Sequence, residues 1–337
     1  MLLDRYQRPL QDLRISVTDR CNFRCTYCMP FDHYEWIEKS LILSYEEIER
    51  LAGLFARLGV EKIRLTGGEP MLRHDLELLV SKLSAVEGIR EVCLTTNGTN
   101  LAEKCCLLKA AGLDRINVSI DTLDRAKFKA VTKRGDLDEV LRGLMAAKDC
   151  GLNPIKINAV IEKGVNDDEI LNLAEFAREH GFGMRFIEYM DVGNANNWTE
   201  TKLVPKRDIL KTIRDRYELR EAGREGGRAP AVDYEYADGG GDLGIIASVT
   251  EPFCGSCSRA RLTADGKLVT CLFSDRGFDL RPLLRGSASD DEILAALRGV
   301  WSARTDRYSE ERWVALQSSG GYRPQSHRKI EMISLGG

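Results

Sequence analysis

Short β-rich runs alternate with helical patterns along the first two thirds of the chain. The runs that predict strands are 12–18, 62–66, 91–95, 115–120, 155–161 and 184–188. Helical patterns lie between and after them, near 45–58, 75–86, 101–111, 124–149, 168–180 and 206–217. This alternation is typical of βα units around a parallel sheet. We therefore expect an α/β fold for this part of the chain.

The number of units limits how the sheet can close. A closed TIM barrel needs eight strands, and the pattern provides six βα units. We predict a partial, incomplete TIM-type barrel of about six βα units, with another segment covering its opening. Two signals indicate helix starts: Ser44 with Glu47 forms a capping box, and Asp167 is a candidate cap for the helix near 168.

The pattern changes after residue 217. Residues 218–242 are rich in glycine and charge, which predicts a mobile connection and a domain boundary. We therefore expect a partial barrel over residues 1–217 and a C-terminal domain over residues 218–337. The two parts differ in pattern, because regular βα alternation stops at this point.

The C-terminal part reads as a small α+β extension. Residues 259–273 alternate as a hairpin, and the pair Asp265 and Gly266 suits its tight turn. Helical patterns follow near 280–285 and 290–304. The chain ends in two glycines, which on composition alone indicate a frayed terminus.

Charge and hydropathy exclude several classes of protein. The 337 residues carry 49 basic and 52 acidic side chains, so the net charge of -3 gives no overall attraction to nucleic acid. The first eleven residues hold no apolar signal core, and no run of eighteen apolar residues occurs. We expect a cytoplasmic protein that binds neither nucleic acid nor a membrane.

Cysteine usage indicates metal or redox chemistry. Ten cysteines in a chain without a signal peptide do not suggest a disulfide framework. Six fall into two groups: Cys21, Cys25 and Cys28, and then Cys254, Cys257 and Cys271. The other four lie in apolar contexts and are expected to be inert buried thiols; they are Cys93, Cys105, Cys106 and Cys150.

The first group has the spacing C-x3-C-x2-C in the loop after the first strand. Three thiolates on a short loop can hold three irons of a 4Fe-4S cluster and leave the fourth iron open to a small molecule. The alternative is a structural zinc site, which is normally closed by four ligands. His33, five residues after Cys28, is the one nearby residue that supports this alternative.

The second group has the spacing C-x2-C-x13-C and again offers three thiolates. A zinc ribbon normally adds a second C-x2-C pair or two histidines. The only histidine in this part of the chain is His327, far downstream of Cys271, so a zinc site completed by His327 is the alternative. A second three-ligand 4Fe-4S cluster explains the spacing better.

Strand parity predicts a group of cations inside the barrel. Lys62 and Arg64 share one face of their strand, while Ile63 and Leu65 share the face expected to meet the helices. The same parity places Lys156 inward. Further cations lie on the first and sixth strands and directly after the second cysteine group, namely Arg14, Arg185, Arg259 and Arg261. Gathering cations away from water is costly unless an anion joins them. Arginine and lysine commonly hold phosphates, so a polyphosphate substrate is favoured.

The alternative for these cations is pairing with internal carboxylates such as Glu188. A different substrate class, for example a peptide bound in an open groove, gives no reason to collect so many cations. A non-enzymatic, zinc-stabilised interaction module is a further alternative. It predicts zinc and no acid-labile sulfide in the purified protein.

The first cysteine motif, with Tyr27 before its third cysteine, resembles that of the radical S-adenosylmethionine (SAM) superfamily. Residues 66–70, Thr-Gly-Gly-Glu-Pro, resemble the GGEP motif of the same superfamily. The resemblance implies that SAM binds the open iron and is cleaved to a 5'-deoxyadenosyl radical. It also implies cofactor-binding roles for Tyr27, Gly68, Thr95, Ser119 and Met190.

The order of motifs along the whole chain is similar to that of the GTP 3',8-cyclase family of molybdenum-cofactor biosynthesis. This resemblance implies that the second cluster binds guanine and that the cations listed above hold GTP. It implies abstraction of the ribose 3' hydrogen and attack of the carbon radical on guanine C8. The terminal Gly336 and Gly337 are then expected to reach into the active site and to be needed for catalysis.

The same resemblance implies several partners. These are GTP, SAM, an electron donor protein or other reductant, and a downstream cyclic pyranopterin monophosphate synthase that receives the product. It also implies a homodimer. A radical SAM peptide-modifying enzyme with auxiliary clusters is the main alternative on this scaffold.

Overall fold

The computed structural model describes the chain except for residues 319–321, 323, 325–328 and 337. Six parallel strands pair in sequence order through its centre. They are β1 (Asp12–Ser16), β2 (Lys62–Thr66), β3 (Glu91–Thr96), β4 (Arg115–Ser119), β5 (Ile155–Ile161) and β6 (Gly183–Glu188). All six lie where the sequence predicts strands, to within two residues at each end.

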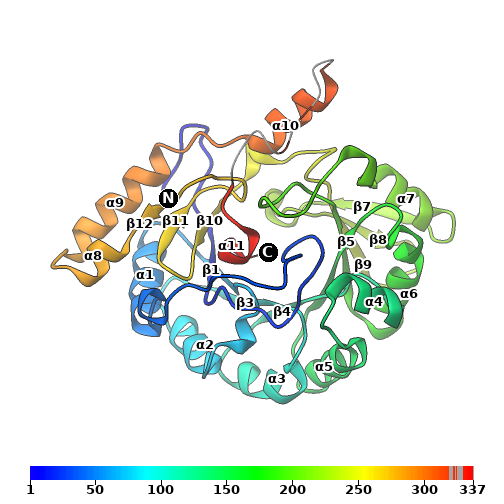
Figure 1. Cartoon of the computed structure of the whole chain (residues 1–337), viewed down its shortest axis with the longest axis horizontal. Helices are drawn as coiled ribbons and strands as arrows, with labels where there is room; N and C mark the ends of the chain where they lie inside the picture. Colours follow the sequence, from blue (N-terminus) through cyan, green and yellow to red (C-terminus); the bar gives the residue numbers. More distant parts are fainter. Residues whose placement is uncertain (319–321, 323, 325–328, 337) are drawn as a thin grey trace.

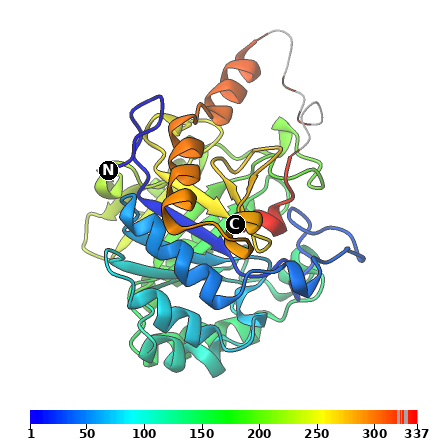
Figure 2. The same cartoon turned by 90° about the vertical axis from the view of Figure 1, so that its left-hand side faces the viewer.

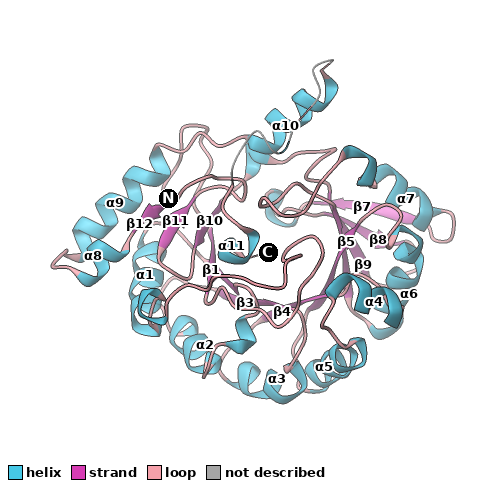
Figure 3. Ribbon diagram, viewed as in Figure 1, coloured by secondary structure: helices cyan, strands magenta, loops and turns pink. Residues whose placement is uncertain are grey.

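Seven helices follow these strands and cover the outer face of the sheet (Figure 1). They are α1 (Tyr45–Arg57), α2 (Leu76–Ser84), α3 (Leu101–Ala110), α4 (Arg125–Thr132), α5 (Leu137–Asp149), α6 (Ile170–His180) and α7 (Lys206–Arg214). The strands form the inner layer and the helices the outer layer (Figure 3). Outward side chains such as Ile63, Leu65 and Ile157 are fully buried in one continuous apolar core beneath the helices.

Local chemistry explains where several helices begin and end. The predicted capping box is confirmed, because Ser44 accepts from the Glu47 N–H and the Glu47 side chain accepts from the Ser44 N–H. The single helix predicted over 124–149 is wrong. Lys133 adopts a positive φ of 59° and Asp136 caps a new helix, so the segment divides into α4 and α5.

Two other expectations are also corrected. Asp167 does not cap α6, because its carboxylate accepts instead from the Gly164 N–H at 2.7 Å and α6 begins after Glu169. The connection over 218–242 is not a mobile linker. It contains β7 (Leu219–Gly223) and β8 (Val232–Tyr236), which pair antiparallel with each other, and β8 pairs with β9 (Asp242–Ile246).

The C-terminal segment extends the sheet at both edges. β9 lies parallel to β6, while β10 (Arg259–Leu262) lies parallel to β1, so the order runs β12-β11-β10-β1-β2-β3-β4-β5-β6-β9-β8-β7. The predicted hairpin is confirmed, because β10 pairs antiparallel with β11 (Lys267–Val269). β12 (Phe278–Asp279) completes this edge.

Among the described residues, four further α-helices follow β12 in the sequence. They are α8 (Arg281–Arg285), α9 (Asp290–Ser302), α10 (Tyr308–Gln317) and α11 (Met332–Leu335). α9 packs on the outside against α1, and α10 projects from the body of the molecule (Figure 2). α11 lies inside the ring formed by the strands and helices (Figure 1). In the described part of the chain no helix is long and apolar enough to cross a membrane.

Candidate active site

The inner face of the sheet lines a cavity of about 580 Å³. The inward direction predicted from strand parity is confirmed for Lys62, Arg64 and Lys156, which line the cavity. The other predicted cations in this lining are Arg14, Arg185, Arg259 and Arg261. Thr95, Met190 and the cysteines of the second group line the same space. Of the described residues, the first cysteine group, Tyr27, Gly68 and Ser119 are not part of this lining.

Three arginines lie side by side across adjacent strands of the cavity wall. Arg261 on β10 is in register with Arg14 on β1, and Arg14 is in register with Arg64 on β2. Burial and the neighbouring Arg261, Arg259 and Arg64 lower the pKa of Arg14 well below its usual value. Burial and Arg259 lower the pKa of Arg261 to about 10. This wall favours an anionic ligand, because an anion relieves the mutual repulsion.

Three of the other predicted cations, Lys62, Lys156 and Arg185, have carboxylate partners. Lys62 pairs with Glu91 at 2.6 Å, and Lys156 lies 4.0 Å from Glu225. Arg185 pairs with Asp233 at 3.1 Å and with Asp242 at 3.0 Å. The cavity therefore has cations that are paired with carboxylates as well as the row of three arginines described above.

Glu188 does not neutralise any of these cations. It is fully buried and accepts from the N–H groups of Lys206, Val249 and Thr250, each at 2.9 Å. Its carboxylate therefore joins the end of β6 to the segments before α7 and after β9. The alternative in which these cations pair with internal carboxylates is therefore wrong for Glu188, although other carboxylates do pair with Lys62, Lys156 and Arg185.

The first cysteine group lies on a tight loop after β1. The N–H groups of Cys28 and Met29 both donate to the Cys25 carbonyl, which forms a turn between the second and third cysteines. The N–H groups of Arg24 and Thr26 donate to carbonyls of residues 132 and 131 at the end of α4. The Cys21 sulfur accepts from the Phe23 N–H at 3.4 Å. The loop is thus held in shape by the backbone.

The glycines of the GGEP segment support this loop directly. A Cβ on Gly68 would lie 2.3 Å from the Arg20 carbonyl oxygen, and one on Gly67 would lie 2.4 Å from that of Thr18. The Gly68 and Glu69 N–H groups donate to these same two carbonyls at 2.8 Å. Glycine is therefore required here for close packing against the cysteine loop.

Carboxyl groups surround the first cysteine group. The Tyr27 hydroxyl donates to Asp121 at 2.8 Å, and Asp121 also accepts from the Val160 N–H. Glu69 accepts from the Thr96 hydroxyl and the Asn97 N–H, each at 2.7 Å. Burial raises the pKa of Asp121 to about 6 and that of Glu69 to about 7.

The remaining predicted cofactor residues lie at the ends of strands β3, β4 and β6. Thr95 on β3 accepts from Arg64 at 3.3 Å, which links the predicted SAM side to the arginine wall. Ser119 on β4 is in register with Asn158 on β5. Met190 follows β6, and its carbonyl accepts from Asn196 at 2.7 Å.

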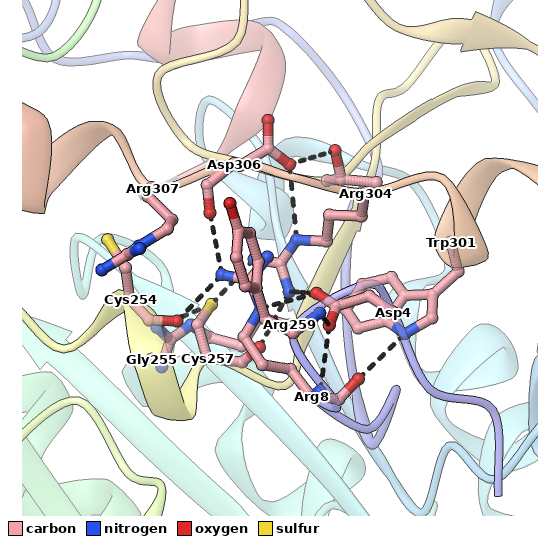
Figure 4. A network of polar contacts seen from close by, with 12 residues as sticks. Asp4, Arg8, Cys254, Gly255, Cys257, Arg259, Trp301, Arg304, Asp306 and Arg307 are labelled. Atoms are coloured by element: carbon pink, nitrogen blue, oxygen red, sulfur yellow. Dashed lines mark hydrogen bonds and ion pairs between the residues drawn. The ribbon is translucent and has the colours of Figure 1, made fainter.

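The second cysteine group lies among guanidinium groups (Figure 4). The Cys257 sulfur accepts from Arg259 at 3.1 Å and from Arg304 at 3.2 Å. Burial by itself raises the pKa of Cys257, but Arg259 and Arg304 together lower it to about 6. Cys271 differs, since burial and the nearby Asp306 raise its pKa to about 12.

The spacing of both groups fits clusters better than single ions. A tetrahedral zinc ion holds its thiolates about 3.8 Å apart, because each Zn–S bond is about 2.3 Å. In the part of the chain that is described, the only ligand group whose atoms all lie within 4.8 Å of one another is Cys105, Cys106 and Cys150. In neither predicted group do all three sulfurs lie within 4.8 Å of one another. His327, the alternative zinc ligand, lies outside the described residues.

The four remaining cysteines are not all inert thiols. Cys106 and Cys150 form a disulfide between α3 and the end of α5, with their Cα atoms 5.2 Å apart. The Cys105 sulfur lies 3.3 Å from that of Cys150. Cys93 and Cys105 are buried, as expected. The expectation of an inert thiol is therefore wrong for Cys106 and Cys150.

The described end of the tail lies between the two cysteine groups. The Gly336 carbonyl accepts from Arg261 at 2.8 Å, and a Cβ on Gly336 would lie 2.2 Å from the Thr66 side chain. Met332 lines the cavity, while Glu331 contributes to raising the pKa of Cys28 after burial and Cys21. Gly337 lies outside the described residues.

A buried ion cluster fixes the path of this tail. Asp191 follows β6 and pairs with Lys329 at 2.5 Å and with Arg312 of α10. All three side chains are almost completely buried. The hydroxyls of Tyr308 and Tyr322 also donate to Asp191. Sequence reasoning missed this cluster, because its members are up to 138 residues apart.

Comparison with known proteins gives two family models in tandem. Residues 15–177 match the Radical SAM superfamily, and residues 182–310 match the family described as Molybdenum Cofactor Synthesis C. The GTP 3',8-cyclase of Aquifex aeolicus is 47% identical over 339 residues and covers 100% of both chains. That of Acidothermus cellulolyticus is 45% identical, covering 99% of this chain and 98% of the relative.

Solved structures share the fold at low sequence identity. SuiB of Streptococcus suis bound to S-adenosylmethionine covers 97% of this chain and 77% of its own, with a TM-score of 0.61 and 16% identity. The protein anSMEcpe with bound AdoMet covers 62% of this chain and 58% of its own, with a TM-score of 0.51 and 19% identity. These likenesses establish the α/β fold of radical SAM enzymes. Given the identity to relatives over its full length, the chain belongs to the GTP 3',8-cyclase family of radical SAM enzymes.

Proposed function

We propose that the protein catalyses the SAM-dependent radical cyclisation of GTP to 3',8-cyclo-7,8-dihydro-GTP in molybdenum-cofactor biosynthesis. The observation that carries the proposal is one cavity wall that holds both the arginine row and the second cysteine group. The arginines suit a triphosphate, and a three-cysteine cluster leaves one iron for the base. A peptide-modifying function is not favoured, since binding a peptide does not require a row of arginines in the cavity wall.

Family membership implies SAM and two 4Fe-4S clusters, and the chain has the cysteines for both. We assign Cys21, Cys25 and Cys28 to the first cluster and Cys254, Cys257 and Cys271 to the second. When bound, the first cluster and SAM supply a 5'-deoxyadenosyl radical that takes the ribose 3' hydrogen. We assign SAM binding to Tyr27, Gly68, Thr95, Ser119 and Met190, which lie at or beside this end of the sheet.

The cations of the cavity then hold and orient GTP. Arg14, Arg259 and Arg261 are assigned to the triphosphate, because they repel one another most strongly without an anion. The other substrate residues in this proposal are Lys62, Arg64, Lys156 and Arg185. Gly336 and Gly337 are assigned to catalysis, since the Gly336 carbonyl already accepts from Arg261.

The proposal extends to architecture and partners. We propose a partial TIM-type barrel of about six βα units over residues 1–217 and a C-terminal domain over 218–337 that covers its opening. The reaction needs a reductant, which an electron donor protein supplies, and its product passes to a cyclic pyranopterin monophosphate synthase. A cytoplasmic homodimer completes the proposal.

The test is an anaerobic assay of the protein with SAM, GTP and dithionite. Hydrogen leaves GTP as a radical and returns as one electron and one proton, so the product is an isomer of GTP. We expect 5'-deoxyadenosine and this isomer in equal amounts, and neither in the Cys25→Ala variant. ATP in place of GTP serves as the substrate control. Formation of 5'-deoxyadenosine without any GTP isomer would overturn the proposal.

A further inference from the structure

A compact ion network lies beside the second cysteine group (Figure 4). It joins the N-terminal segment to the segment after α9 and consists of Asp4, Arg8, Arg304 and Asp306. Arg8 and Asp4 pair at 2.5 Å, and Arg304 lies 3.6 Å from Asp4 and 3.3 Å from Asp306. The side chains of Asp4, Arg8 and Arg304 are at most 2% exposed.

This network contacts the backbone or side chain beside all three cysteines. Arg8 donates to the Cys254 carbonyl at 2.9 Å. Arg304 donates to the Cys257 carbonyl at 2.8 Å and to the Cys257 sulfur at 3.2 Å. Asp306 accepts at 2.6 Å from the hydroxyl of residue 270, the neighbour of Cys271. One set of buried charges therefore fixes the whole ligand group.

Arg304 is the member that reaches the sulfur itself. Its guanidinium lies 4.6 Å from the centre of the Trp301 ring, and the Trp301 indole donates to the Arg8 carbonyl at 3.2 Å. Asp4 and Asp306 form ion pairs with the other two nitrogens of Arg304, so its guanidinium is held in one orientation. A fixed positive donor at a ligand sulfur stabilises the reduced, more negative state of an iron-sulfur cluster.

We propose that Arg304 is a positioning residue for the second cluster: held by Asp4 and Asp306, it orients Cys257 and raises the reduction potential of that cluster alone. The proposal rests on the assignment of the second cluster to Cys254, Cys257 and Cys271. It does not depend on the identity of the substrate. The first cluster has no such donor among the described residues, so it provides an internal reference.

The test compares Arg304→Gln, Arg304→Lys and a matched control, Arg307→Gln, in anaerobically purified holoenzyme. Arg307 lies three residues away, and its side chain is 47% exposed in an ion pair with Glu310. Redox titration followed by electron paramagnetic resonance measures each cluster, and iron content measures occupancy. We expect Arg304→Gln to shift only the second cluster to a more negative potential and to lower its iron content.

Arg304→Lys keeps the charge but not the fork, so we expect a potential between those of the wild type and Arg304→Gln. Arg307→Gln should match the wild type in both clusters. Unchanged potentials in Arg304→Gln, or equal shifts in both clusters, would overturn the proposal. If Arg304→Gln does not fold, an unchanged second-cluster potential in Arg304→Lys overturns it. These readouts require no GTP, so failure of the proposed function remains a separate result.

Discussion

The two cysteine groups each offer three thiolates but differ in spacing and in electrostatic surroundings. Burial and Glu69 raise the pKa of Cys21 to about 11, and burial, Cys28 and Asp121 raise the pKa of Cys25 well above its usual value. At the second group, by contrast, Arg259 and Arg304 outweigh burial and lower the pKa of Cys257. Carboxyls thus lie near the first group, and two guanidiniums lie beside Cys257 of the second, whereas Cys271 lies near Asp306. This difference supports the proposal that the second group faces GTP, while the first serves SAM, which carries an ammonium and a sulfonium.

The largest expected effect comes from removing one cluster at a time. We predict that Cys25→Ala abolishes SAM cleavage, because its loop lies against the GGEP segment. Cys257→Ala should abolish GTP turnover but keep dithionite-driven 5'-deoxyadenosine formation. Chromatographic measurement of 5'-deoxyadenosine in both variants tests this division. Loss of SAM cleavage in Cys257→Ala, with the first cluster intact by spectroscopy, would contradict it.

The tail lies between the two groups, so its removal should uncouple them. Deleting Gly336 and Gly337 should leave both clusters and the fold intact but abolish GTP cyclisation. Gly336→Ala should lower turnover by roughly 10- to 100-fold, because it clashes with Thr66 and disturbs a charge-assisted contact worth about 1.5–3 kcal/mol.

Gly181→Ala is the matched control for Gly336→Ala. Gly181 also has a positive φ, 71°, but an added Cβ meets nothing within 4 Å. We expect its turnover to stay near that of the wild type. Normal cyclisation by the truncated protein would show that the tail has no catalytic role.

Substitution in the arginine row should affect the binding of GTP but not that of SAM. Arg14→Ala should weaken GTP binding by about 1.5–3 kcal/mol, or roughly 10- to 100-fold, and leave SAM binding nearly unchanged. Arg14 is the cleanest choice, since Arg261 also holds Gly336 and Arg259 also contacts Cys257. Arg207→Ala, with a side chain that is 85% exposed, serves as the control. Equal weakening of both ligands in anaerobic calorimetry would refute the assignment.

A smaller effect concerns the carboxyls around the first group. Burial raises the pKa of Asp121 from 3.8 to about 6. Between these two pH values the folded protein keeps a proton on Asp121 that the unfolded chain releases. The contribution to stability is therefore present below pH 3.8 and is lost as pH rises towards 6. Asp121→Asn should abolish this dependence.

The measurement is anaerobic denaturant unfolding of the holoenzyme at about pH 5 and about pH 7. The free energy of unfolding of Asp121→Asn, relative to that of the wild type, should be about 1 kcal/mol higher at about pH 7 than at about pH 5. A constant difference between the two proteins at both pH values would show that Asp121 does not titrate in this window.

Strand and helix periodicity predicted most of the central parallel sheet and its helices, since each βα unit carries its own local pattern. β7 and β8 were missed because their pairing overrides a composition rich in glycine and charge. The parallel pairing of β10 with β1 joins residues about 250 apart, and no local pattern contains that information. Interior cations were predicted by alternation along strands, whereas their partners Glu225 and Asp233 come from the segment read as a linker.

The buried ion networks were beyond sequence reasoning for a related reason. Arg304 follows a helix end and reaches a cysteine 47 residues earlier, and Asp4 and Arg8 lie outside any regular element. The disulfide between Cys106 and Cys150 likewise depends on how α3 packs against α5. Such contacts follow from tertiary packing and not from spacing along the chain.

The most direct test of the central claim uses GTP deuterated at the ribose 3' position. With SAM and reductant under anaerobic conditions, we predict one deuterium in 5'-deoxyadenosine and a cyclised product that has lost it. Both are measured by mass spectrometry in a single reaction. Deuterium retained in GTP, or 5'-deoxyadenosine formed without label, would contradict hydrogen abstraction from this substrate and with it the proposed function.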